Sequence, residues 1–425
     1  MTDRLAPGAE LVGRDDTRGL VIDYQKLVSA TAAIFVFCGA IAIIEPSPYD
    51  FASLVAMPLW FLGGFTIHRS FVLFAALLLG FTATGFLALI PYWDNADSAL
   101  YMYQSAYLTL TSLYFALFVG NRTKDRLELI FKAYAGAALL ASFCGVLGYF
   151  SPNGVGALFN HYGRASGTFK DPNVLGSFVI LGGVYLAQNL VLMRTRRIFL
   201  SALFLAIIVA GVFLSFSRGS WGAFIFSFLL MIGAAYFTST DARMKRRIAA
   251  ATLVAGAVAV IVVLILLSMA ETREFFLQRA SVTQDYDEGS TGRFGNQLRS
   301  IPMLLERFGG FGPLRFRLVF NLEPHNSYIG AFANGGWIGG FLFILIVCVS
   351  SYVGFRLMFR PSPYQRQAQV LFPALLAFFL QAFQIDIDHW RHVLLMLGSL
   401  WGLEAGRQKW EDQQSRVPRN AGAKR

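Results

Sequence analysis

The sequence has little cysteine and little charge for its length. Its 425 residues include three cysteines, and each lies inside a hydrophobic run: Cys38, Cys144 and Cys348. Their spacing provides neither a disulfide framework nor a set of metal ligands. Only 14% of the residues are charged, whereas 56% are hydrophobic and the mean hydropathy is +0.54. Soluble domains do not carry so much apolar surface, so this composition indicates an integral membrane protein.

The signatures of several enzyme classes are absent as well. The chain has no Walker motif, no dinucleotide fingerprint, no HExxH and no CxxC, so the chemistries that use these motifs are not indicated. It has no internal repeat and no charge at the centre of a hydrophobic run, which argues against an ion-coupled transporter. Because these motifs are missing, we expect no cofactor and no metal. We also expect no nucleic-acid partner, because the net charge of +11 fits basic cytoplasmic loops.

Long hydrophobic runs are what the sequence has in quantity. Each is close to the ~20 residues that a bilayer core requires. The predicted fold class is therefore an all-α integral membrane protein with about twelve transmembrane helices. The predicted spans are roughly 27–44, 51–67, 71–90, 100–120, 129–149, 174–193, 198–217, 219–237, 248–268, 328–350, 370–385 and 393–405.

Basic residues alternate between the two sides of these spans. Every second connection is rich in lysine and arginine, whereas the short loops 45–50 and 91–99 contain neither. The positive-inside rule then predicts that both termini are cytoplasmic. The organisation that follows is a cytoplasmic segment 1–26, a transmembrane domain 27–407 and a cytoplasmic tail 408–425. The long polar loop, about residues 270–327, faces outward and is predicted to be periplasmic.

This outward loop carries arginine but no lysine. Its basic residues are Arg273, Arg279, Arg293, Arg299, Arg307, Arg315 and Arg317. The planar guanidinium fork suits phosphate, although loop acids such as Glu271 and Asp285 provide an alternative set of partners. Apolar residues recur in the loop at helical spacing and predict an amphipathic helix on the membrane surface, which Pro302 is expected to kink or divide. They are Phe294, Leu298, Ile301, Leu305 and Phe308.

Three helix beginnings are predicted to face the same outer side. Arg218 lies in a tight turn between two spans, beside the positive end of the next helix, and this pairing predicts an anion site. The alternative is that Arg218 reaches to lipid headgroups. Asp171-Pro172-Asn173 begins another span, with Arg164 and Lys170 close before it. The third beginning is His325-Asn326-Ser327, in which capping alone accounts for Ser327.

His325 is a candidate general base because an imidazole titrates near neutral pH. The alternative is a structural histidine at a helix start, and Asn326 or Glu323 is a candidate for orienting it. The last outward turn runs from Asp386 to His392 and also holds Asp388 and His389. That turn is either a contact for the acceptor or an ordinary solvated turn, and we favour the solvated turn.

Four segments together resemble the O-antigen ligase and polysaccharide polymerase superfamily, the group with the Wzy-C domain. They are "GRASGTFKDPNVLG", "SFSRGSWGAF" around Arg218, "STGRFGNQLRSIPMLLERFGGFG" and "EPHNSYIGAFANGGWIGGFLFIL". The resemblance covers about residues 163–350.

This resemblance implies a metal-independent, inverting glycosyltransferase at the periplasmic face of the bacterial inner membrane. Such enzymes pass a glycan from an undecaprenyl-diphosphate carrier to an acceptor hydroxyl. By the resemblance, Arg218 and Arg293 hold the diphosphate and His325 activates the acceptor. We assign Arg164, Lys170, Asn326 and Arg299 to substrate binding.

The resemblance leaves the acceptor open. Polymerisation of exopolysaccharide or O-antigen repeat units is the preferred activity, because the outer loop is moderate in length. Ligation to lipid A core is the alternative, and a polysaccharide flippase is the alternative from another class. The expected partners are membrane lipid, the lipid-linked oligosaccharide, and proteins of polysaccharide export or chain-length control.

Overall fold

The structure is a computed structural model that describes residues 23–280, 289 and 292–416, most of them helical. The short elements are the 3-10 helices η1 (Ile90–Tyr92) and η2 (Gly154–Phe159) and the antiparallel pair β1 (Asn160–His161) and β2 (Arg164–Ala165). The α-helices are α1 (Tyr24–Cys38), α2 (Pro48–Leu62), α3 (Arg69–Leu89), α4 (Ala96–Gly120), α5 (Thr123–Phe150), α6 (Pro172–Phe178), α7 (Ile180–Val191), α8 (Ile198–Leu214), α9 (Arg218–Thr238), α10 (Ala242–Leu267), α11 (Ala270–Ala280), α12 (Arg293–Glu306), α13 (Phe316–Phe320), α14 (Ser327–Phe359), α15 (Gln365–Gln381) and α16 (Arg391–Arg416).

Each predicted span coincides with a helix, and the one at 174–193 forms two consecutive helices, α6 and α7. Within the described residues, six helical stretches are long and apolar enough to cross a membrane, and α1 and α8 are shorter apolar helices. The chain is therefore an almost wholly helical membrane protein. The twelve crossings and the side that each loop faces stay predictions. Most of segment 1–26, the end of the tail and the loop acid Asp285 lie outside the described residues.

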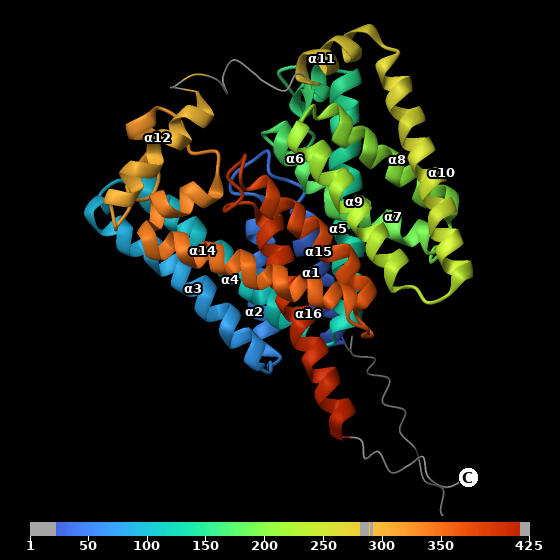
Figure 1. Cartoon of the computed structure of the whole chain (residues 1–425), viewed down its shortest axis with the longest axis horizontal. Coiled ribbons are helices and arrows are strands. Elements are labelled where there is room, and N and C mark those ends of the chain that lie inside the picture. The colour runs from blue at the N-terminus through green and yellow to red at the C-terminus, as the bar shows by residue number, and fades with distance from the viewer. Residues whose placement is uncertain (1–22, 281–288, 290–291, 417–425) are drawn as a thin grey trace, which may run out of the picture.

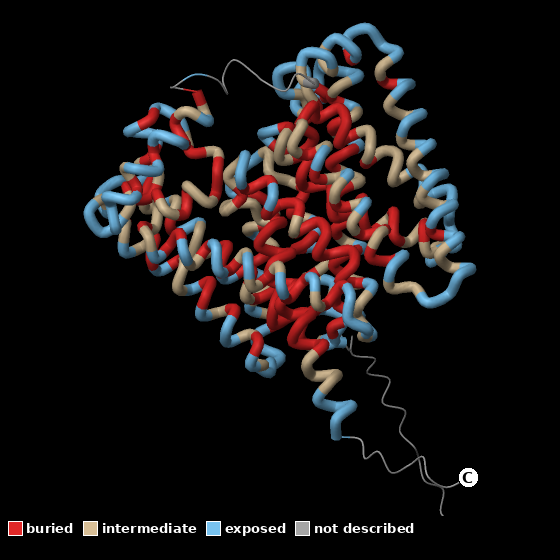
Figure 2. The backbone as a smooth tube through the Cα atoms, viewed as in Figure 1, coloured by how far each residue is buried: buried red, intermediate tan, exposed pale blue. Residues whose placement is uncertain are grey.

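The helices pack in pairs around a buried centre (Figure 1). α3 packs on α14, α4 on α16, α5 on α8, and α9 on α15. Figure 2 shows that buried residues gather around α15 and the first half of α16. By contrast, α10 lies at the periphery and buries only Ile248 and Leu266 of its apolar side chains. An apolar helix that packs so little of its surface suits lipid as its surroundings.

The outward loop forms α11, α12 and α13. α11 and α12 lie at the end of the molecule opposite to the last turns of α16 (Figure 1). α12 is one continuous helix, so of the two expected effects of Pro302, a kink or a division, the structure excludes the division. Proline removes one hydrogen bond from a helix, and α12 continues past it to Glu306.

α14 binds this loop at a break in its own helical backbone. The break is at Gly336, where φ is 66° and ψ is −165°. The break leaves the carbonyl of Ala333 to accept hydrogen bonds from the backbone N–H groups of Phe311 and Gly312, at 2.8 and 3.0 Å. In turn, Trp337 donates its backbone N–H to the carbonyl of Phe308 at 2.9 Å. A Cβ at Gly336 would lie 2.3 Å from that Phe308 oxygen, so the position admits only glycine.

Candidate functional site

An open cavity of about 1050 Å³ lies between helices α9 and α15 and the segments that precede α6, α9 and α14. Four arginines line it: Arg164, Arg218, Arg279 and Arg293. His325 lines the same cavity, as do the carboxylates Asp171 and Asp386. The structure thus brings together four of the seven residues assigned to the site from the sequence.

Arg218 is the first residue of α9 and lies at the cavity wall. Ser217 caps the helix by accepting a hydrogen bond from the Ser220 backbone N–H. The preceding residue, Phe216, has a φ of 47° and its ring is buried. A bulky residue adopts a positive φ only where its surroundings hold it there. The turn therefore fixes the direction in which Arg218 and the positive end of α9 face the cavity.

Arg164 supports this turn. Its Nε donates to the Ser215 carbonyl at 2.8 Å and its Nη2 donates to Asn173 Oδ1 at 3.0 Å. It therefore connects the start of α6 to the start of α9. Because two of its donors bind other protein groups, Arg164 positions the turn before α9 in addition to lining the cavity. Lys170 is not among the cavity residues and forms an exposed ion pair with Glu45 at 3.0 Å.

Arg293 begins α12 and lines the same cavity as Arg218. Its Nη1 donates to the Gln384 carbonyl at 3.2 Å, and its guanidinium carbon lies 4.7 Å from the Phe294 ring centre. Arg299, one and a half turns later in α12, is exposed and lies over the Phe320 ring, away from the cavity residues. The two arginines of α12 therefore differ in surroundings.

α12 is amphipathic as predicted, but its polar side faces the protein. Asn296, Gln297 and Ser300 are buried, whereas the five apolar residues that predicted the helix are exposed, Leu298 by 70%. Gln297 Nε2 donates to the carbonyls of Pro324 and His325, at 2.9 and 3.4 Å. Exposed apolar residues on such a helix favour contact with lipid. The buried polar side holds the segment that precedes α14.

His325 lies in that segment with a φ of 45°. Its backbone N–H donates to Asp386 Oδ2 at 3.1 Å, and the N–H of Asn326 donates to Asp386 Oδ1 at 3.0 Å. The Nδ1 atom of His325 is 3.7 Å from Asp386 Oδ2. Asp386 therefore contacts both the backbone and the ring of His325. It has the orienting role for which the sequence suggested Asn326 or Glu323.

Asn326 is occupied by structural contacts. Its Oδ1 caps α14 by accepting from the N–H groups of Tyr328 and Ile329, and its Nδ2 donates to the Phe383 carbonyl at 3.2 Å. It is buried and is not among the cavity residues.

The turn between α15 and α16 is not an ordinary solvated turn, so that interpretation is wrong. Asp388 accepts from the Tyr101 hydroxyl at 2.5 Å and lies 3.0 Å from His389 Nδ1. Burial, together with the negative charge of Asp388, raises the pKa of Asp386 to about 7. Burial also opposes ionisation of Asp388, but His389 and the Tyr101 hydroxyl outweigh it and keep its pKa below the usual value. Two carboxyls so different in proton affinity indicate a functional turn.

The sequence carried a signal for this turn, because two acids and a histidine lie within four residues directly after a predicted span. Arg279 was counted among the loop arginines but not assigned to the site, because charge alone does not distinguish it from its neighbours. Among the described residues, no three of His, Cys, Asp and Glu gather as a group that could hold a metal ion.

Part of the chain matches a known protein family. Residues 202–344 match the family model of the Wzy_C domain, described as O-antigen ligase. The matched stretch contains Arg218, Arg293 and His325 and lies inside the 163–350 stretch of the sequence resemblance. No curated protein matches the chain.

Proposed function

Since its Wzy_C domain places this chain in the O-antigen ligase and polymerase superfamily, we propose that it transfers glycan from an undecaprenyl-diphosphate carrier to an acceptor hydroxyl. The observation that carries the proposal is the cavity at which Arg218, Arg293 and His325 meet. It combines a cationic surface for a diphosphate with a base for a hydroxyl.

The diphosphate would lie between Arg218 and Arg293. The beginning of α9 adds its positive dipole end to the charge of Arg218. Arg279 contributes a further guanidinium to the same cavity. These fixed positive charges stabilise the negative charge that develops on a leaving diphosphate. They supply the charge compensation that a metal ion gives in other transferases, so we propose a metal-independent reaction.

An apolar wall of the cavity supports a lipid-linked donor. It is formed by one side of α9 and one side of α15, and its residues are Gly222, Ala223, Phe226, Ala377 and Leu380. A Cβ at Gly222 would meet no atom within 4 Å, so this wall leaves open space. A polyprenyl chain fits this wall, because the wall lies in the same cavity as the arginines and runs along α9 and α15.

His325 would act on the acceptor. Its Nδ1 faces Asp386, so we assign proton transfer to Nε2. Nε2 takes the proton of the acceptor hydroxyl while the oxygen attacks C1 of the donor sugar. The bond from C1 to the diphosphate oxygen breaks and its electron pair leaves with the diphosphate. Attack opposite the leaving group inverts the configuration at C1.

We prefer polymerisation of exopolysaccharide or O-antigen repeat units over ligation to lipid A core. Purified protein supplied only with lipid-linked repeat units should form longer lipid-linked glycans, because donor and acceptor are then the same class of molecule. A ligase would leave the donor unchanged until lipid A core is added. A deletion strain reports the same difference: loss of a polymerase leaves single repeats, whereas loss of a ligase leaves long chains unattached to lipid A. Transport of the donor without any new glycosidic bond would favour the flippase alternative.

We propose that the protein lies in the bacterial inner membrane with both termini in the cytoplasm and the cavity facing the periplasm. The alternating lysine and arginine content of the loops supports this orientation. Reporter fusions after Gly310 and after Arg425 should therefore give opposite compartments, with Gly310 periplasmic. The same compartment for both fusions would contradict the topology.

A further inference from the structure

Two carboxyl groups lie behind His325, and each has its own set of partners. Asp386 accepts the backbone N–H groups of His325 and Asn326 and faces the imidazole Nδ1 at 3.7 Å. Asp388, two residues later, accepts from Tyr101 and from His389. Asp386 thus faces the proposed base, whereas the contacts of Asp388 are with Tyr101 and His389.

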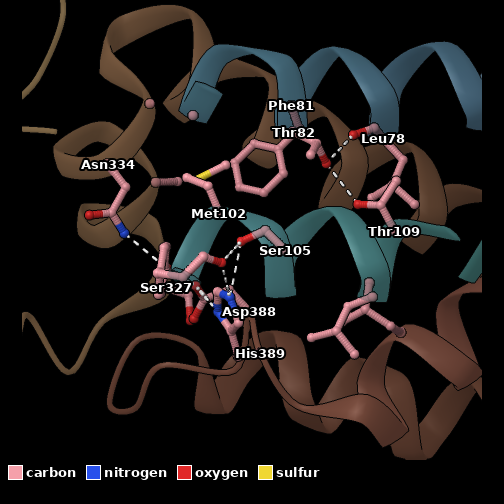
Figure 3. A pocket seen from close by; sticks show the side chains of 16 residues that line it. Leu78, Phe81, Thr82, Met102, Ser105, Thr109, Ser327, Asn334, Asp388 and His389 are labelled. Carbon is pink, nitrogen blue, oxygen red and sulfur yellow. Dashed lines mark hydrogen bonds and ion pairs between the residues drawn. The ribbon is translucent and has the colours of Figure 1, made fainter. Parts of the chain in front are cut away.

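Tyr101, Asp388 and His389 line a small cavity of about 60 Å³, whose lining residues differ from those of the large one (Figure 3). His389 Nε2 lies 3.0 Å from Ser105 Oγ and 3.2 Å from the Tyr101 carbonyl, both on α4. Asn334 of α14 donates to the Tyr101 hydroxyl at 3.1 Å. This network fixes His389 and Asp388 between α4, α14 and the α15–α16 turn, so a negative charge is held in a constant place behind Asp386.

The charge of Asp388 acts strongly on Asp386, because the two carboxyls are two residues apart and burial keeps water away from Asp386. Burial and Asp388 raise the pKa of Asp386, and Glu323 adds to the effect, whereas the two backbone N–H groups oppose it. Two cationic groups lie nearby: Arg293 of α12, which donates to the Gln384 carbonyl, and His389 on the same turn as Asp386. Burial lowers the pKa of His389, but the charge of Asp388 outweighs it and raises the pKa above its usual value. The result is a carboxyl whose protonation changes near neutral pH and that faces the imidazole of His325.

We propose that Asp386 is the positioning residue of His325, and that the Asp388–His389–Tyr101 cluster tunes the proton affinity of Asp386. This inference rests on the proposed function for its catalytic consequence. As Nε2 of His325 takes the acceptor proton, Nδ1 keeps its own proton toward Asp386, and the ion pair stabilises the imidazolium. The two backbone hydrogen bonds to Asp386 keep the ring in place at its unfavourable φ.

Asp386→Asn separates this role from a purely structural one, because the amide retains one oxygen that accepts a backbone N–H but loses the charge. We expect kcat for glycan transfer to fall about 10²-fold or more while KM for the donor stays near the wild-type value. Asp388→Asn should move the acid side of the pH–rate profile to lower pH by about one unit, because the like charge that raises the proton affinity of Asp386 is removed. Asp97→Asn is the matched control, since Asp97 is exposed and pairs with Arg317, and it should behave as wild type.

A second measurement does not depend on activity. The chain has five histidines, so isotope-labelled imidazole signals of the full-length protein can be assigned by substitution. Asp386→Asn should shift the titration of the His325 signal, and Asp388→Asn should shift it less. Wild-type kcat in Asp386→Asn, or an Asp388→Asn profile lowered evenly at every pH, would overturn the inference. An inactive wild-type protein that shows the coupled titration would contradict the proposed function and leave the His325–Asp386 coupling standing.

Discussion

Replacement of His325 by alanine should lower kcat for glycan transfer about 10²- to 10⁴-fold and leave KM for the donor largely unchanged. A sugar hydroxyl is a poor nucleophile at neutral pH, so removal of its proton in the transition state supplies much of the rate. The arginines that would hold the donor are untouched by the substitution. The measurement is turnover of a purified lipid-diphosphate-linked glycan, with and without EDTA. The chelator should have no effect on either protein.

His161→Ala is the matched control for this prediction. His161 also lies in a connection between spans, but it is exposed, belongs to β1 and is not among the cavity residues. The control should keep wild-type turnover. Equal turnover in His325→Ala would reduce His325 to a structural residue at the start of α14, and loss of activity in EDTA would contradict the metal-independent reaction.

Arg218→Ala should lower kcat about 10²- to 10³-fold, the usual effect of removing one donor that stabilises developing negative charge. Arg218→Lys should recover little of this loss, because lysine keeps the charge but not the planar fork that grips two phosphate oxygens. Arg293→Ala should act in the same direction. Its effect should not simply add to that of Arg218→Ala, since the two residues would hold one diphosphate. Turnover and donor binding measured on the purified variants report both effects.

Arg273→Ala provides the comparison, because Arg273 belongs to the same loop but is exposed and lies outside the cavity residues. It should bind and turn over donor as the wild type does. Full activity in both Arg218→Ala and Arg293→Ala would exclude the proposed diphosphate site.

The helices follow closely from the sequence because their signal is local. A run of about 20 apolar residues has few structures open to it in a membrane other than a helix, and each predicted span coincides with one. Arg218 and His325 also emerged from local patterns, since each stands at a predicted helix beginning, whereas Arg293 was assigned through the family resemblance. The structure places these three around one cavity.

The residues that contact Arg218, Arg293 and His325 could not be predicted from the sequence in the same way. Asp386 lies 61 positions after His325, and only the packing of α15 against α14 brings the two together. Likewise, the sequence marks Arg164 as a cation but does not reveal that its donors reach Ser215 and Asn173. Asn326 was assigned to substrate because it neighbours His325, whereas its amide caps α14. Long-range contacts decide such roles, and a single sequence does not contain them.

The position of the α15–α16 turn late in the chain has a consequence for biosynthesis. Gln384 and Asp386 lie late in the sequence, yet they hold Arg293 and His325, which are synthesised earlier. The ribosome must therefore add almost all of the chain before these contacts exist. A chain truncated before this turn would therefore lack the contacts that Gln384 and Asp386 give to Arg293 and His325.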